Sequence, residues 1–144
     1  MALKIIFMGT PEFAVPVLKS IQKSNHKILE VYTQPAKRKD RGQKIINSPV
    51  YKCAEQYNLN IRCPISLESE EELDHFKSLK PDLAIVVAYG KILPTKLLNQ
   101  EKILFINLHA SLLPKWRGAA PIQRAIMSME KETGLTTMQI VEKL

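Results

Sequence analysis

Two side chains that could act together on a carbonyl group, Asn107 and His109, directly follow the apolar run of residues 103–106. An apolar run that gives way to polar residues is typical of a buried strand, and open α/β sheets carry their functional residues at the carboxyl ends of strands. Because side chains alternate along a strand, Asn107 and His109 are predicted to point to one side, within about 7 Å of each other. The amide could hold a developing negative oxygen and the imidazole could exchange a proton, so the pair suits attack on a carbonyl carbon. The alternative is a turn-forming asparagine beside a histidine without chemistry.

A second strand end is expected to lie beside this pair. Residues 83–88 form the most strand-like run of the sequence and are predicted to be central in a parallel sheet. The run ends at Tyr89 and Gly90, and the glycine permits close approach of a ligand to the backbone. We therefore expect the carboxyl ends of the 83–88 and 103–106 strands to form one site.

The first residues predict the start of a Rossmann-like unit. An apolar strand over residues 4–8 leads into a turn at Gly9, with Thr10 as the expected N-cap of a helix over residues 11–23. The dinucleotide fingerprint requires three glycines, and this turn has one. The pattern therefore favours the fold without favouring NAD as a ligand.

The remaining elements complete a single α/β domain over residues 1–144, with a Rossmann-like open, mostly parallel sheet and helices on both faces. His26 and His75 are assigned no chemistry, with His75 predicted to face water. Cys53 and Cys63 lack the spacing of a zinc site or a disulfide framework, so both are expected to be reduced, and no metal is expected. Further strands are predicted at 27–33, 60–64 and 133–141, and helices at 49–57, 69–79, 94–99 and 119–129.

The segment from Gln34 to Pro49 contains no hydrophobic period long enough for a helix or strand and is predicted to be a long loop. It supplies four of the seven net positive charges of the chain. We expect it to dock on nucleic-acid phosphates, with Arg41 as the best single anchor; a solvated loop without a partner is the alternative. Its basic residues are Lys37, Arg38, Lys39, Arg41 and Lys44.

Composition fits a globular protein outside the membrane. Hydrophobic residues make up 45% of the chain and charged residues 24%. The longest apolar runs are far shorter than the roughly 20 residues of a membrane helix, and the amino terminus has no export leader. A cytoplasmic location without membrane association is the expectation.

Several motifs resemble those of one family. The run from Asn107 to Gln123, Asn-Leu-His-Ala-Ser-Leu-Leu-Pro-Lys-Trp-Arg-Gly-Ala-Ala-Pro-Ile-Gln, resembles the signature of the folate-dependent formyltransferases, and most closely the branch that acts on methionyl-tRNA. The resemblance is collinear from the first residue to the last. It also includes residues 4–14, Thr33-Gln34-Pro35, Arg41-Gly42, Ser48-Pro49-Val50 and residues 86–94.

The resemblance implies a role for each of these segments. Asn107 would stabilise the oxyanion and His109 would move the proton, with 10-formyltetrahydrofolate as the formyl donor. The basic segment would grip the acceptor arm of the initiator Met-tRNA, and the full-length enzyme would be a monomer. The pterin would lie between two backbone walls, one formed by Val87, Ala88, Tyr89 and Gly90, the other by Ser111, Leu112, Leu113 and Pro114.

One departure from the family pattern affects the expected activity. Family members keep a catalytic aspartate in a Leu-Asp-x-Gly-Asp segment, and the sequence ends one position short of it, without the carboxyl-terminal tRNA-binding barrel domain. We therefore expect a catalytic domain that is incomplete at its carboxyl end and has little transfer activity alone. The alternatives are a glycinamide ribonucleotide or sugar-nucleotide formyltransferase, a formyltetrahydrofolate deformylase, or a non-catalytic RNA-binding module.

Overall fold

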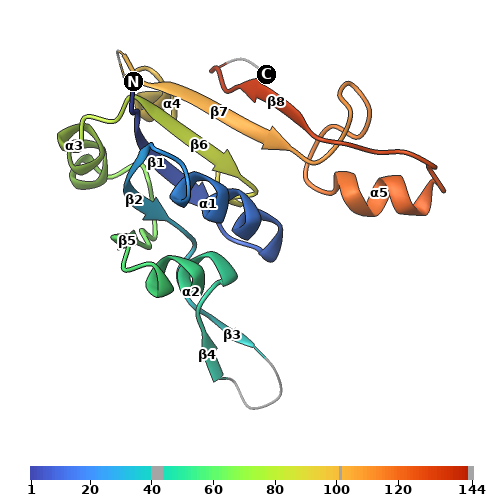
Figure 1. Cartoon of the computed structure of the whole chain (residues 1–144), viewed down its shortest axis with the longest axis horizontal. Coiled ribbons are helices and arrows are strands. Elements are labelled where there is room, and N and C mark those ends of the chain that lie inside the picture. Colours follow the sequence, from blue (N-terminus) through green and yellow to red (C-terminus); the bar gives the residue numbers. More distant parts are fainter. Residues whose placement is uncertain (40–43, 101, 143–144) are drawn as a thin grey trace.

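A six-stranded sheet lies at the centre of the computed structural model, which describes residues 1–39, 44–100 and 102–142. Within these residues the strand order is β5-β2-β1-β6-β7-β8 (Figure 1). All neighbouring pairs are parallel except β7 and β8, which are antiparallel. This confirms the predicted Rossmann-like, mostly parallel sheet. The strands are β1 (Lys4–Gly9), β2 (Lys27–Tyr32), β5 (Ile61–Arg62), β6 (Leu83–Val87), β7 (Leu104–His109) and β8 (Thr136–Gln139).

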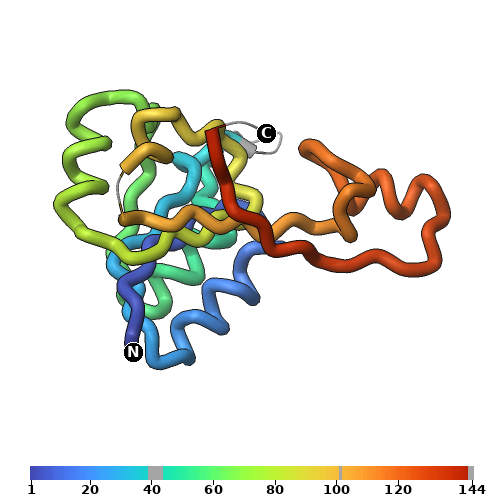
Figure 2. The backbone as a smooth tube through the Cα atoms, turned by 90° about the horizontal axis from the view of Figure 1, so that it is seen from above, coloured from blue at the N-terminus to red at the C-terminus, as the bar shows by residue number. Residues whose placement is uncertain are grey.

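Helices cover both faces of the sheet, as Figure 2 shows in a view turned by 90°. The short 3₁₀ helix η1 (Glu12–Ala14), α1 (Val15–Gln22) and α2 (Pro49–Gln56) pack on one face. The helices α3 (Glu70–Ser78) and α4 (Thr95–Leu98) pack on the other. The segment that carries α5 (Pro121–Met127) extends away from the sheet in both views. No helix in the described part of the chain is long and apolar enough to cross a membrane.

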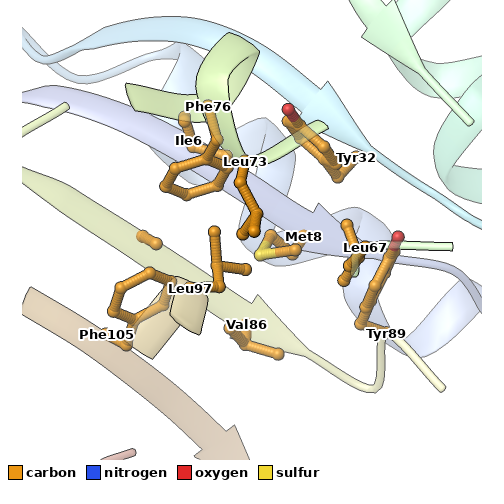
Figure 3. Close-up of a cluster of buried hydrophobic side chains, with 11 residues drawn as sticks. Ile6, Met8, Tyr32, Leu67, Leu73, Phe76, Val86, Tyr89, Leu97 and Phe105 are labelled. Atoms are coloured by element: carbon orange, nitrogen blue, oxygen red, sulfur yellow. The ribbon is translucent and has the colours of Figure 1, made fainter. Parts of the chain in front are cut away.

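Alternation along β1 explains why this strand reads as a continuous apolar run. Ile6 and Met8 belong to the cluster under α3 and α4, whereas Phe7 belongs to the cluster under α1 and α2. Figure 3 shows the first cluster. Its aromatic centre is Phe76, whose ring centroid lies 5.6 Å from that of Tyr32 and 5.8 Å from that of Phe105. A strand buried on both faces needs apolar residues at every position, so the periodicity of two disappears.

The first helix begins later than the sequence predicts. The helix expected over residues 11–23 is split into η1 and α1, and Thr10 is not its N-cap. The Thr10 hydroxyl donates instead to the carbonyl of Tyr89 at 2.8 Å. The predicted cap is therefore wrong because a contact between distant strand ends uses the same oxygen. Ser48 and Ser69 do cap α2 and α3, each accepting a backbone N–H of the first turn.

The segment predicted to be a long loop contains a short β-hairpin. Strands β3 (Lys37–Lys39) and β4 (Lys44–Ile46) pair antiparallel, with Arg38 opposite Ile45. Each strand has three residues, and the side chain of Ile45 is 73% exposed. A ribbon this short, with little buried surface, produces no hydrophobic period, which is why the prediction missed it.

His75 does not simply face water, contrary to prediction. Its Nε2 lies 2.7 Å from Oε2 of Glu30, whose residue is 8% exposed. Glu30 is on β2 and would otherwise be a buried carboxylate without a partner, which is costly. Both cysteines are free thiols, as expected.

Candidate active site at the carboxyl ends of the central strands

A cavity of about 550 Å³ opens where β1, β6 and β7 end. Gly9 pairs with Val87, and Val86 pairs with Asn107, so the three carboxyl ends lie along one edge of the sheet. Strand β7 continues to His109, which pairs with Thr136 of β8. The lining includes Pro11, Phe13, Val86, Ala88, Tyr89, Gly90, Lys91, Asn107, Leu108, His109, Ala110, Gly118, Ala119, Pro121, Ile122 and Gln123.

The structure brings Asn107 and His109 together in this cavity. Both belong to β7, and strand alternation places them on the same face of the sheet. Both are partly buried, so their side chains reach a ligand while water is partly excluded. An amide donor beside an imidazole in a half-enclosed cavity can hold a negative oxygen and exchange a proton with the same bound molecule.

A backbone hydrogen bond fixes the protonation pattern of His109. Its Nε2 lies 3.0 Å from the carbonyl oxygen of Trp116. A carbonyl oxygen only accepts, so Nε2 carries the hydrogen and donates it. In the neutral ring, Nδ1 is then the nitrogen with a free lone pair. Trp116 has a positive φ of 56° and Gly118 a φ of 95°, so the chain folds back through left-handed backbone as it passes the imidazole.

The backbone around Tyr89 is held in an unusual conformation on the other side of the cavity. Ala88 has a φ of 48° and Gly90 a φ of 82°, both in the left-handed region. The carbonyl of Tyr89 accepts two hydrogen bonds, from the Thr10 hydroxyl at 2.8 Å and from Nε2 of Gln34 at 3.0 Å. Thr10 also accepts the backbone N–H of Gln34 at 3.3 Å. Positive φ at a non-glycine residue is uncommon and costs free energy, and this network is what holds it here.

We expect Gly90→Ala to lower the free energy of unfolding by two separable effects. A left-handed alanine costs about 1–2 kcal/mol, and its Cβ would collide with Nε2 of Gln34. Urea unfolding should show that Gly90→Ala costs less in a Gln34→Ala background, because only the backbone effect remains. Gly118→Ala is the matched control, since nothing lies within 4 Å of its added Cβ. Equal costs for Gly90→Ala in both backgrounds would contradict the steric contact.

Lys91 is a cavity residue that the sequence analysis missed. Its ammonium donates to the carbonyls of Pro64 and Ile65, at 2.6 and 2.7 Å, and so ties the loop after β5 to the cavity. Burial, together with the positive charge of Lys37, lowers the pKa of Lys91. The sequence feature that could have indicated a role for Lys91 is its position directly after Tyr89 and Gly90. Because Lys37 belongs to β3, Lys91 is electrostatically coupled to the basic hairpin.

Five of the predicted folate-contacting residues lie outside the lining of this cavity. Val87 is fully buried against α1 and α2. The Ser111 hydroxyl donates to the carbonyl of Lys115 at 2.7 Å, and the Leu113 amide donates to the Thr136 hydroxyl at 3.1 Å. Leu112 and Pro114 line a separate cavity of about 230 Å³. The lining contains instead Gly118, Ala119, Pro121, Ile122 and Gln123, and their Gly-Ala-Ala-Pro run is the sequence signal that could have pointed to them.

The basic hairpin β3–β4 extends from the body of the fold (Figure 1). Lys37, Arg38 and Lys44 are exposed, Lys39 completes β3, and Arg41 lies outside the described residues. The two ends of the hairpin are tied together, since the hydroxyls of Thr33 and Ser48 lie 2.6 Å apart. The structure therefore presents exposed cations on an anchored ribbon. Among the described residues, no group of three or more His, Cys, Asp or Glu could hold a metal.

Comparison with known proteins identifies the family of the chain. The sequence profile described as Formyl transferase matches residues 3–144, so the chain belongs to the formyl transferase family. The methionyl-tRNA formyltransferase of Pelagibacter ubique is 59% identical over 145 residues, covering all of this chain and 47% of that relative. The enzyme of the same name from Coxiella burnetii is 51% identical, covering all of this chain and 46% of the relative. The chain thus spans about half the length of the curated relatives it matches.

Solved structures share the fold at much lower identity. Phosphoribosylglycinamide formyltransferase from Anaplasma phagocytophilum superposes with a TM-score of 0.73 at 19% identity, covering all of this chain and 67% of that one. A sugar N-formyltransferase from Shewanella gives a TM-score of 0.65 at 17% identity, covering 99% of this chain and 52% of that one. At these identities the likeness concerns the fold alone.

Proposed function

We propose that this chain is the part of a methionyl-tRNA formyltransferase that transfers the formyl group of 10-formyltetrahydrofolate to the amino group of methionyl initiator tRNA. The observation that carries the proposal is the position of Asn107 and His109 in one cavity, facing the Ala88–Gly90 backbone. The names of the relatives at 51–59% identity support the choice of acceptor.

The reaction joins the amine nitrogen to the formyl carbon and breaks the bond between that carbon and N10 of the folate. Asn107 donates its side-chain N–H to the oxygen that becomes negative in the tetrahedral intermediate. His109 holds a hydrogen on Nε2 through the Trp116 carbonyl, so Nδ1 accepts the proton of the attacking amine. The same proton then passes to the departing N10, and the balance of atoms closes without a metal.

The proposed folate site uses the backbone more than side chains. The pterin lies along Ala88, Tyr89 and Gly90, which line the cavity. Gly118, Ala119, Pro121, Ile122 and Gln123 complete the lining around the proposed ring, while Val87 and the segment Ser111–Pro114 lie outside it. Pockets of this size bind small organic ligands through mostly apolar surfaces and a few polar contacts, and the lining of this cavity has that composition.

The proposed tRNA contact is the β3–β4 hairpin. Lys37, Arg38, Lys39 and Lys44 carry charge suited to phosphates, and Arg41 is included from the sequence alone. The hairpin joins the body through Gln34, which also holds the Tyr89 carbonyl of the folate wall. One residue thus connects the two proposed binding surfaces.

Assays with different formyl acceptors, each supplied separately, distinguish the proposal from its alternatives. The protein is incubated with radiolabelled 10-formyltetrahydrofolate and, in turn, methionyl initiator tRNA, glycinamide ribonucleotide, a UDP-amino sugar or no acceptor. The expected product is formylmethionyl-tRNA, in the low yield expected above for this chain alone. Release of formate without an acceptor would identify a deformylase, and label on either small acceptor would overturn the tRNA assignment. Protection of the 88–90 amides from hydrogen exchange by tetrahydrofolate tests the binding surface independently of turnover.

A further inference from the structure

A basic cavity of about 610 Å³ opens at the end of the sheet opposite Asn107 and His109. It lies where β1, β6 and β7 begin, between the last turn of α3 and the segment after α4. In Figure 1, α3 and α4 lie on the other side of the fold from the β3–β4 hairpin. Its lining residues are Lys4, Lys77, Lys80, Pro81, Asp82, Lys96, Asn99, Gln100, Lys102 and Ile103.

Positive charge dominates this second cavity. Five of its ten lining residues are lysines, and none of them forms an ion pair with another described residue. Among the lining residues that the structure describes, the single acidic side chain is Asp82, whose Oδ2 accepts the backbone N–H of Lys4 at 2.7 Å. Like charges gathered on a concave surface repel one another, so a bound anion would relieve the repulsion and be attracted by all five.

An unsatisfied amide at the same place points independently to a ligand. Gln100 is 8% exposed, and neither its Nε2 nor its Oε1 has a hydrogen-bond partner. A buried amide without partners costs roughly 1–3 kcal/mol. The amide of Gln100 makes no hydrogen bond in the free protein. Turning it toward a bound molecule would therefore break no hydrogen bond. Its donor and acceptor match the edge of a nucleobase better than a bare inorganic ion.

We propose that this cavity binds a nucleoside polyphosphate, with the phosphates on the lysines and the base edge on Gln100. The volume suits a ligand of that size, and lysine ammonium groups are effective point charges for phosphate. The site is separate from the cavity that contains Asn107 and His109. A ligand bound here would therefore lie at the opposite end of the sheet and would not contact the reacting groups. The phosphates of an RNA backbone share this chemistry, and the test distinguishes the two sources.

Calorimetric titration with ATP and with inorganic tripolyphosphate, at low salt, tests the site. Lys77→Gln combined with Lys96→Gln is expected to weaken both ligands at least tenfold. The control is Lys19→Gln with Lys23→Gln on and just after α1, which removes the same charge from exposed positions outside the cavity and should change affinity less than twofold. Absence of saturable ATP binding, or equal losses in both double variants, would overturn the proposal.

Gln100→Leu tests the contribution of the amide. Removing an unpartnered buried amide should raise the melting temperature, while ATP affinity falls several-fold and tripolyphosphate affinity is unchanged. Unchanged ATP affinity would overturn the nucleotide assignment. A gel shift with initiator tRNA completes the test. If Lys77→Gln/Lys96→Gln loses more tRNA affinity than the Lys19→Gln/Lys23→Gln control, RNA supplies the phosphates. That result would overturn the proposal that the cavity binds a nucleoside polyphosphate.

Discussion

His109→Ala and Asn107→Ala are each expected to lower kcat/KM for formyl transfer by about 100-fold to 1,000-fold. Both side chains line the cavity, and loss of one oxyanion donor or of the proton-accepting nitrogen removes an interaction made mainly in the transition state. Folate affinity should therefore change little, because the proposed pterin contacts are backbone groups at Ala88–Gly90. Turnover is measured with saturating methionyl-tRNA, and folate affinity by fluorescence titration.

Controls separate chemistry from folding in these two variants. His26→Ala removes a histidine that accepts the Leu3 amide at the other end of the sheet, and it should leave turnover within twofold. The double variant Asn107→Ala/His109→Ala should lose less than the product of the single losses, because the two groups act on one intermediate. Turnover within a few-fold of the parent protein in either single variant would refute the assignment.

Neutralising the hairpin is expected to weaken binding of methionyl initiator tRNA by about 10-fold to 100-fold. The variant is Lys37→Gln/Lys39→Gln/Lys44→Gln, which removes three charges from β3 and β4. Each exposed contact between a lysine and a phosphate contributes about 0.5–1 kcal/mol, and its loss reduces counterion release. A filter-binding series in salt should therefore show a log–log slope that is shallower by about 3.

A matched triple substitution shows whether position matters more than net charge. Lys19, Lys23 and Lys27 are also exposed, and their replacement by Gln removes the same total charge. Affinity for tRNA should then fall less than threefold. Equal losses in the two triple variants would mean that the hairpin has no special role. Arg41→Gln, tested separately, addresses the anchor that was inferred from sequence.

The sequence predicted the sheet and the pairing of the two central side chains because both follow from local rules. Residues 83–88 are apolar throughout since β6 is buried on both faces, and that composition is recognisable without a partner strand. Asn107 and His109 share a face because alternation along a strand does not depend on the rest of the fold.

Contacts between distant segments could not be predicted in the same way. The hydrogen bond from His109 to the Trp116 carbonyl depends on how the intervening turn folds back. The capture of the Tyr89 carbonyl by Thr10 and Gln34 joins three strand ends that are separated by tens of residues. A propensity argument assigns Thr10 to a helix cap because it considers only neighbours in sequence. The hairpin was missed for the opposite reason, since its strands bury too little surface to leave a pattern.

The central place of β1 has a consequence for synthesis on the ribosome. The first strand of the chain has β2 on one side and β6 on the other, and the amide of Lys4 donates to Asp82, 78 residues away. At about 5–20 residues per second, a nascent chain needs roughly 4–16 s before that partner is made. During this interval one edge of this apolar strand stays open, so the growing polypeptide would depend on chaperones for longer than one whose early strands pair with each other.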